Sequence, residues 1–244
     1  MFNESPTECR NAPILSTGMP LMQCTRACPN PQLSVAGTVI TGTGRAGTSF
    51  LMAVLSTLGI PTGFNSSYAR GVLQNTPYHA GLESVPTAFL CRSNALCTES
   101  IVFEKRRQVI KSPYLALQDR FPLWLTPPVS GLANVILPIR SSTETAASRN
   151  ANGQDRPGGF WNHATDYLSQ QHSDEHLLST LMVELTKQDV DVTRLHYPSH
   201  VVDPQYIARK LEWLLCRYNI SKHVFVKVHK SLYNMTLVHS NSRL

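Results

Sequence analysis

Two kinds of apolar pattern alternate along this chain. Short apolar runs, typical of buried strands, occupy residues 39–40, 101–103, 108–110, 135–139 and 224–228, the last being a strand or a short packed segment. Helical segments are expected at residues 50–58, 174–185 and 203–218. Because helical segments separate the strand-like runs, the pattern predicts an α/β fold with a mostly parallel sheet.

Several boundaries follow from local chemistry. Residues 60–99 have many turn formers and no sustained period, so we expect an irregular lid or substrate loop there. Ser141 and Glu144 have capping-box spacing for the helix that begins near them. Asp203 with Pro204 suits the start of the last expected helix.

A glycine-rich turn follows the first apolar run and precedes the first helix. Its glycines, Gly42, Gly44 and Gly47, let successive backbone N–H groups point inward, and the helix N-terminus adds partial positive charge. The turn is therefore suited to hold a phosphate. The spacing from Gly42 to Gly47 matches the Walker A frame, but Thr48 stands where that frame requires lysine. The cation lies inside the loop instead, at Arg45.

The strand ends differ from those of magnesium-dependent ATPases and kinases. Those enzymes use an aspartate at a strand end to help hold the metal, whereas neither 134–139 nor 225–228 ends in aspartate here. Pro113 ends a strand directly after Lys111 and Ser112, at the edge where open α/β sheets bind ligands. No metal is expected at this site.

Arg140 and Ser148 form a second candidate anion site. Arg140 follows a strand-like run, and Ser148 lies on the helix after it. A guanidinium can hold a phosphate with two hydrogen bonds while a hydroxyl donates from the side. The competing interpretation is a capped helix beside an exposed arginine.

Together these motifs resemble a known family. Residues 45–50, R-A-G-T-S-F, resemble the K-S-G-T-T-W phosphosulfate loop of sulfotransferases that use 3′-phosphoadenosine 5′-phosphosulfate (PAPS), and Arg140 and Ser148 have the spacing of the Arg and Ser that hold its 3′-phosphate. The resemblance implies a three-layer α/β/α P-loop fold in one domain, residues 35–244, after an irregular N-terminal extension, residues 1–34.

The resemblance also implies an activity and its residues. PAPS would serve as cosubstrate, and its sulfuryl group would move to a hydroxyl or amine of a small-molecule acceptor. Arg45 and Lys111 are the candidate catalytic cations, and Phe50 either stacks on adenine or belongs to the core. The residues implied to bind the cosubstrate are Gly42, Thr43, Gly44, Arg45, Ala46, Gly47, Thr48, Ser49, Phe50, Arg140 and Ser148.

The general base is left open by the sequence. Cytosolic sulfotransferases use a histidine where this chain has Ser112 and Pro113, whereas other branches take a glutamate from the segment after the first helix. Glu83, in the A-G-L-E motif, is the corresponding acid here, and His163 is its rival. The remaining interpretation is that Glu83 is a solvated loop charge.

Composition limits the remaining classes. The 244 residues are 42% hydrophobic with a net charge of +6, which allows one sizeable core and suggests an anionic partner. The cations are scattered, with no run longer than 105–107, which argues against nucleic-acid binding. No apolar run approaches the ~18 residues of a membrane span, and residues 1–34 do not resemble a secretory signal. A cytoplasmic location with free cysteine thiols is expected, because no paired C-x-x-C spacing occurs.

Two other functions compete with sulfuryl transfer. The basic, glycine-rich C-terminal segment that closes over the nucleotide in cytosolic sulfotransferases is not recognisable here. A sulfotransferase-like scaffold that binds without transferring, or that catalyses another biosynthetic reaction, is therefore the main alternative. A small-molecule kinase is the third.

Overall fold

The computed structural model describes residues 37–75, 82, 108–112, 132–152, 159–161 and 164–233. The chain divides into two units, Met1–Leu33 and Ser34–Leu244, and every described residue belongs to the second. The expected extension, residues 1–34, and the expected strand at residues 101–103 lie outside the described residues.

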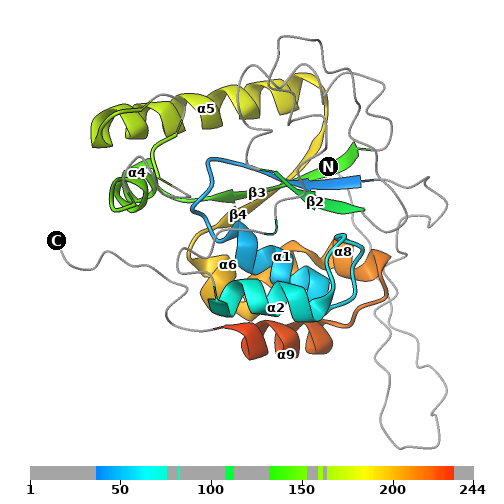
Figure 1. Ribbon diagram of the computed structural model, residues 1–244. Coiled ribbons are helices and arrows are strands. Elements are labelled where there is room, and N and C mark those ends of the chain that lie inside the picture. Colours follow the sequence, from blue (N-terminus) through cyan, green and yellow to red (C-terminus); the bar gives the residue numbers. More distant parts are fainter. Residues whose placement is uncertain are drawn as a thin grey trace, which may run out of the picture. The chain divides into compact units, whose positions relative to one another are not determined.

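A parallel sheet of four strands organises this unit, in the order β2-β1-β3-β4 (Figure 1). Ile40 at the end of β1 is opposite Lys111 on β2 and Ile136 on β3, so β3 continues past the end of β1 toward Arg140. The strands are β1 (Gly37–Ile40), β2 (Val109–Lys111), β3 (Leu132–Ile139) and β4 (Asp191–His196).

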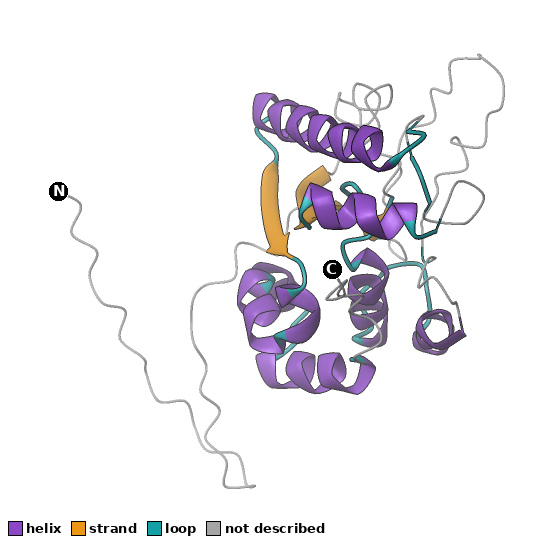
Figure 2. Cartoon of the chain, turned by 90° about the vertical axis from the view of Figure 1, so that its left-hand side faces the viewer, coloured by secondary structure: helices purple, strands orange, loops and turns teal. Residues whose placement is uncertain are grey.

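Helices cover both faces of the sheet, so the α/β class and the parallel sheet predicted from the sequence are confirmed (Figures 1 and 2). Helices α4 and α5 pack together on one face, and α1 lies on the other with the C-terminal helices. The helices are α1 (Thr48–Thr57), α2 (Ser66–Asn75), α4 (Ser142–Asn150), α5 (Tyr167–Lys187), α6 (Ser199–Val202), α7 (Pro204–Lys210), α8 (Glu212–Arg217) and α9 (Lys222–Leu232).

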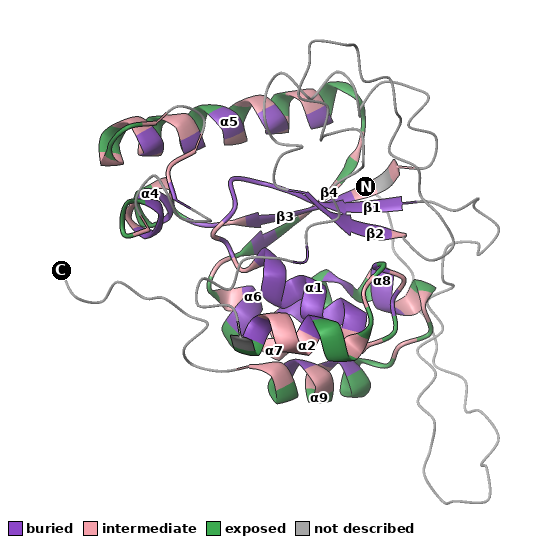
Figure 3. Cartoon of the chain, in the orientation of Figure 1, coloured by how far each residue is buried: buried purple, intermediate pink, exposed green. Residues whose placement is uncertain are grey.

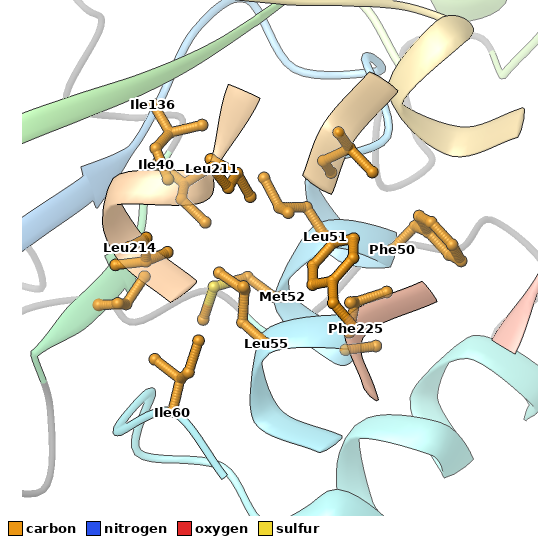
Figure 4. Close-up of a cluster of buried hydrophobic side chains, with 14 of the residues drawn as sticks. Ile40, Phe50, Leu51, Met52, Leu55, Ile60, Ile136, Leu211, Leu214 and Phe225 are labelled. Carbon is orange, nitrogen blue, oxygen red and sulfur yellow. The ribbon is translucent and has the colours of Figure 1, made fainter. Parts of the chain in front are cut away.

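Two apolar clusters hold the layers together, because successive strand residues point to opposite faces. Val39 joins the cluster under α5, with Leu177, Leu181 and Leu185, whereas its neighbour Ile40 joins the cluster around α1. Figure 4 shows this second cluster, and Figure 3 shows α1 buried on all sides. Helix α1, which follows the glycine-rich turn, is thus anchored deep in the fold.

One expected helix start is confirmed, and two expected helices differ in extent. Asp166 caps α5, which extends the expected helix 174–185 in both directions. The Asp203 side chain accepts from the N–H groups of Gln205 and Tyr206 at the start of α7, as predicted. The expected helix 203–218 is two helices, with the break at Leu211.

Four expectations are wrong. Residues 224–228 form part of helix α9 because Phe225 and His229, four apart, both point into the core. Residues 66–75 form helix α2 within the segment expected to be irregular. Ser141 is the N-cap of α4, but its side chain makes no capping bond, and Glu144 accepts from Arg140. Cys216 is disulfide-bonded, so it is not the free thiol that was expected.

Strand β4 was not predicted. Its sequence, D-V-T-R-L-H, buries only Leu195 and has no continuous apolar run. Among the described helices, none combines the length and the apolar composition that crossing a bilayer requires.

Candidate functional site

The glycine-rich turn lies where the chain leaves adjacent strands in opposite directions. After β1 the chain enters α1 on one face of the sheet, and after β3 it enters α4 on the other. Such a switch point at the carboxyl ends of parallel strands opens a crevice, and ligands of open α/β sheets bind there. The loop of residues 41–47 and Arg140 both occupy this edge.

The loop has the backbone conformation of an anion cradle. Gly42, Gly44 and Gly47 have φ of 137°, 73° and 74°, and Arg45 also has a positive φ, 54°. Gly47 is the N-cap of α1, and a Cβ there would lie 2.8 Å from both His200 Nε2 and Val201 Cγ2. Only glycine fits that position without strain. The turn therefore aims the N-terminus of a buried helix at the strand edge.

The structure brings together Arg45, Arg140 and Ser148, which are far apart in sequence. Arg45 Nε donates to Ser148 Oγ at 3.1 Å. Arg140 Nη1 donates to the carbonyl oxygen of Arg45 at 3.1 Å, and its guanidinium lies over the Tyr197 ring, 4.6 Å from the centroid. The loop cation and the candidate 3′-phosphate pair thus form one cluster.

A third arginine, Arg149, fastens the loop from α4. Its Nη2 donates to the carbonyl oxygen of Thr43, and its Nη1 donates to that of Gly159 at 2.8 Å. The guanidinium lies 4.7 Å from the centroid of Trp161 and 4.0 Å, by Nε, from Asp174 Oδ1. Arg140 and Arg149 thus each bind a loop carbonyl and hold the loop conformation, and the sequence analysis singled out only Arg140.

Lys111 brings a buried ammonium to the same edge. Its Nζ donates to Ser49 Oγ at 2.8 Å, and the residue is only 2% exposed. The Thr41 hydroxyl donates to the carbonyl oxygen of Ser112 at 2.9 Å, which fixes the end of β2 against the start of the loop. The expectation that Lys111 lies at the carboxyl edge beside the loop is confirmed.

Two buried histidines support the loop from below. His200 Nδ1 donates to the His196 carbonyl oxygen at 3.0 Å, while its Nε2 faces Gly47 and has no hydrogen-bond partner in the described part of the chain. Burial lowers the pKa of His200 to about 4, so the ring is neutral near pH 7. His229 Nε2 in turn donates to the His200 carbonyl oxygen at 3.1 Å.

The electrostatics of the cluster favour an anion. Burial and the neighbouring Arg140 cation both lower the pKa of the Arg45 guanidinium, which nevertheless stays charged at any physiological pH. Among the described residues, the carboxylates that pair with this group are Glu144, on Arg140, and Asp174, near Arg149. Burial raises the pKa of Asp174 to about 6. Four cations, Arg45, Arg140, Arg149 and Lys111, thus lie at this edge, and a bound anion would offset their mutual repulsion.

Other predicted residues have different outcomes. Phe50 is 3% exposed and packs edge-on against His229 at 4.9 Å, so it belongs to the core, the second of the two interpretations left open. Thr43, Ala46, Thr48 and Ser49 are all buried at the turn. Both candidate bases, Glu83 and His163, lie outside the described residues.

Two supporting residues were missed by sequence reasoning. Arg149 directly follows Ser148, and Tyr197 precedes a proline, so neither carries a local signal for its contacts.

Comparison of the chain with family models, with curated proteins and with solved structures found no match.

Proposed function

We propose that this chain is a sulfotransferase that moves a sulfuryl group from PAPS to a hydroxyl or amine of a small-molecule acceptor. The observation that carries the proposal is the cluster of Arg45, Arg140 and Ser148 at the phosphate loop. The two halves of the motif are separated by about a hundred residues of sequence, yet they meet through direct hydrogen bonds. The competing interpretation, a capped helix beside an exposed arginine, does not fit, because Arg140 is only 6% exposed.

The donor set fits a phosphosulfate nucleotide. Arg45, Arg140 and Lys111 supply positive charge, and Ser49 and Ser148 supply hydroxyls beside them. Guanidinium groups and hydroxyls suit the oxygens of phosphate and sulfate. The two described strand ends nearest the loop offer Lys111 and Arg140 where a kinase would use a carboxylate on magnesium, which makes the kinase the weaker candidate.

In this proposal the protein acts chiefly by stabilising charge. The bond between sulfur and the bridging oxygen of the 5′-phosphate breaks as a bond from the acceptor oxygen or nitrogen to sulfur forms. Negative charge then develops on the bridging oxygen, where the loop N–H groups and Arg45 would stabilise it. The buried Lys111 ammonium, which donates to Ser49 Oγ, would add positive charge beside the 5′-phosphate. The acceptor's proton goes to a base, for which Glu83 and His163 remain the candidates from the sequence.

The test is nucleotide discrimination at the 3′-phosphate. Thermal unfolding would be measured with 3′-phosphoadenosine 5′-phosphate, with AMP and with magnesium ATP. A ligand at 100 times its dissociation constant adds about 2.7 kcal/mol, which raises the melting temperature of a domain of this size by roughly 5–10 °C. We expect that shift for the bisphosphate only, and loss of the preference over AMP in Arg140→Ala.

Arg194→Ala is the matched control. It removes the same charge from an exposed position on β4, so it should keep the preference for the bisphosphate over AMP. Equal losses for bisphosphate and AMP in Arg140→Ala would refute the 3′-phosphate assignment. An intact fold without any shift would favour a scaffold that has lost transfer, and a larger shift with magnesium ATP would favour a kinase. Mass spectrometry of acceptor mixtures for a product heavier by one sulfuryl group then tests transfer itself.

A further inference from the structure

Three helices on the α1 side of the sheet carry only basic charges. α2 and α9 pack against α1, and α7 packs against α9 (Figures 1 and 3). None of the three contains Asp or Glu. Their cations are Arg70 on α2, Arg209 and Lys210 on α7, and Lys222, Lys227 and Lys230 on α9. We call this surface the basic face.

The described helices on the other face of the sheet do not share this bias. Helices α4 and α5, across the sheet, contain more acids than bases, with Asp174, Glu175 and Glu184 on α5 alone. The acids closest in sequence to the basic face are Asp203, which caps α7, and Glu212 at the start of α8. Among the described helices, cations that are scattered in the sequence thus gather on the α1 side of the sheet, and this charge asymmetry would orient the protein toward an anionic surface.

The basic face also exposes apolar side chains. Tyr68 on α2 and Val224 on α9 are 56% and 48% exposed. On α9, Phe225 and His229 are buried, whereas Lys227, Lys230 and Val224 are exposed. A helix that mixes lysines and exposed apolar groups suits the interface of a lipid bilayer, where cations meet head groups and apolar side chains reach the acyl boundary.

We propose that the basic face docks this protein on an anionic membrane surface. The attachment is peripheral and reversible. Its strength comes mainly from several lysines within a Debye length of the head groups, with a smaller contribution from Tyr68 and Val224. The proposal is independent of the reaction at the phosphate loop.

The experiment is flotation with lipid vesicles. Vesicles of phosphatidylcholine with about one third phosphatidylserine would be compared with phosphatidylcholine alone, at salt concentrations of about 0.1 M and about 0.5 M. We expect the full chain to float only with the anionic vesicles and at the lower salt concentration. Lys227→Gln/Lys230→Gln should weaken binding by about 25-fold, since each lysine near such a surface contributes about fivefold. Val224→Ser should weaken binding less.

The matched control is Lys187→Gln/Arg194→Gln, which removes two exposed charges from α5 and β4 and should leave flotation unchanged. Circular dichroism checks that both double variants fold. Absence of flotation, equal flotation with uncharged vesicles, or equal losses in the two double variants would each overturn the proposal. Retention on heparin or RNA without flotation would overturn it in favour of a soluble polyanion as partner.

Discussion

Replacing Asp174 by asparagine should alter how the free energy of unfolding depends on pH. The Asp174 side chain is 2% exposed, accepts one hydrogen bond from Gln170 Nε2 at 3.0 Å and lies 4.0 Å from Arg149. Burial raises its pKa from 3.8 to about 6, and the Arg149 charge and the Gln170 bond offset only part of that rise. The ionised carboxylate is therefore costly in the folded state.

The sign and magnitude follow from proton linkage. Between about pH 4 and pH 6 the folded state holds a proton on Asp174 that the unfolded chain has released, so this group lowers stability as pH rises. A difference of about two pKa units corresponds to about 3 kcal/mol. Asp174→Asn lacks this term, so its stability relative to the parent chain should rise by about 3 kcal/mol between pH 4 and pH 7.

His200 provides a test of opposite sign. Burial lowers its pKa from 6.5 to about 4, so between these values the unfolded chain holds a proton that the folded state lacks. Its contribution to stability is present above pH 6.5 and is lost as pH falls toward 4, by about 3 kcal/mol. His200→Gln should therefore lose stability relative to the parent chain as pH rises, the reverse of Asp174→Asn.

Urea unfolding followed by circular dichroism at half-unit pH steps would measure these differences. Glu175→Gln is the control, because Glu175 is the next residue but is exposed, and hydrogen bonds from Ser142 and Gln171 lower its pKa. The free energy of unfolding of Glu175→Gln should not rise relative to that of the parent chain as pH rises. Parallel curves for Asp174→Asn and the parent chain across this range would refute the buried, destabilised carboxylate.

Two further predictions concern the loop. Gly47→Ala should lower the free energy of unfolding by more than about 2 kcal/mol, measured in urea, because its Cβ would meet His200 and Val201 at 2.8 Å and φ is 74°. An unchanged midpoint would contradict this packing. Lys111→Met should leave the fold intact and weaken bisphosphate binding at least tenfold by calorimetry, because it removes the buried ammonium beside Ser49. Unaltered affinity would exclude Lys111 from the site.

Local backbone chemistry explains what the sequence could predict. Gly42, Gly44 and Gly47 are needed because the turn uses positive φ at each, and such a requirement is visible in the residue types alone. The strand at residues 132–139 was equally visible, since a strand covered on both faces has a continuous apolar run. Both features depend on neighbours in sequence.

The failures depend on tertiary contacts. Residues 224–228 have the composition of a strand. They form a helix because α9 buries Phe225 and His229, four residues apart, and a histidine gives no apolar signal in the sequence pattern. β4 lies at the edge of the described sheet and buries one side chain. Its mostly polar sequence therefore lacks the apolar run that predicts a strand. Glu144 had capping-box spacing, but Arg140 offered it a charged partner instead.

The same distinction separates the residues that contact a ligand from those that hold the loop in shape. Arg45 was predictable because it lies inside the glycine turn, whereas Arg149 reaches Thr43 only because α4 packs beside α5 and Gly159. Arg140 and Arg149 both bind loop carbonyls, so each helps to fix the direction of the backbone N–H groups of the loop. A site that uses backbone donors needs such rigid support, because a donor stabilises developing charge best when it does not have to reorient.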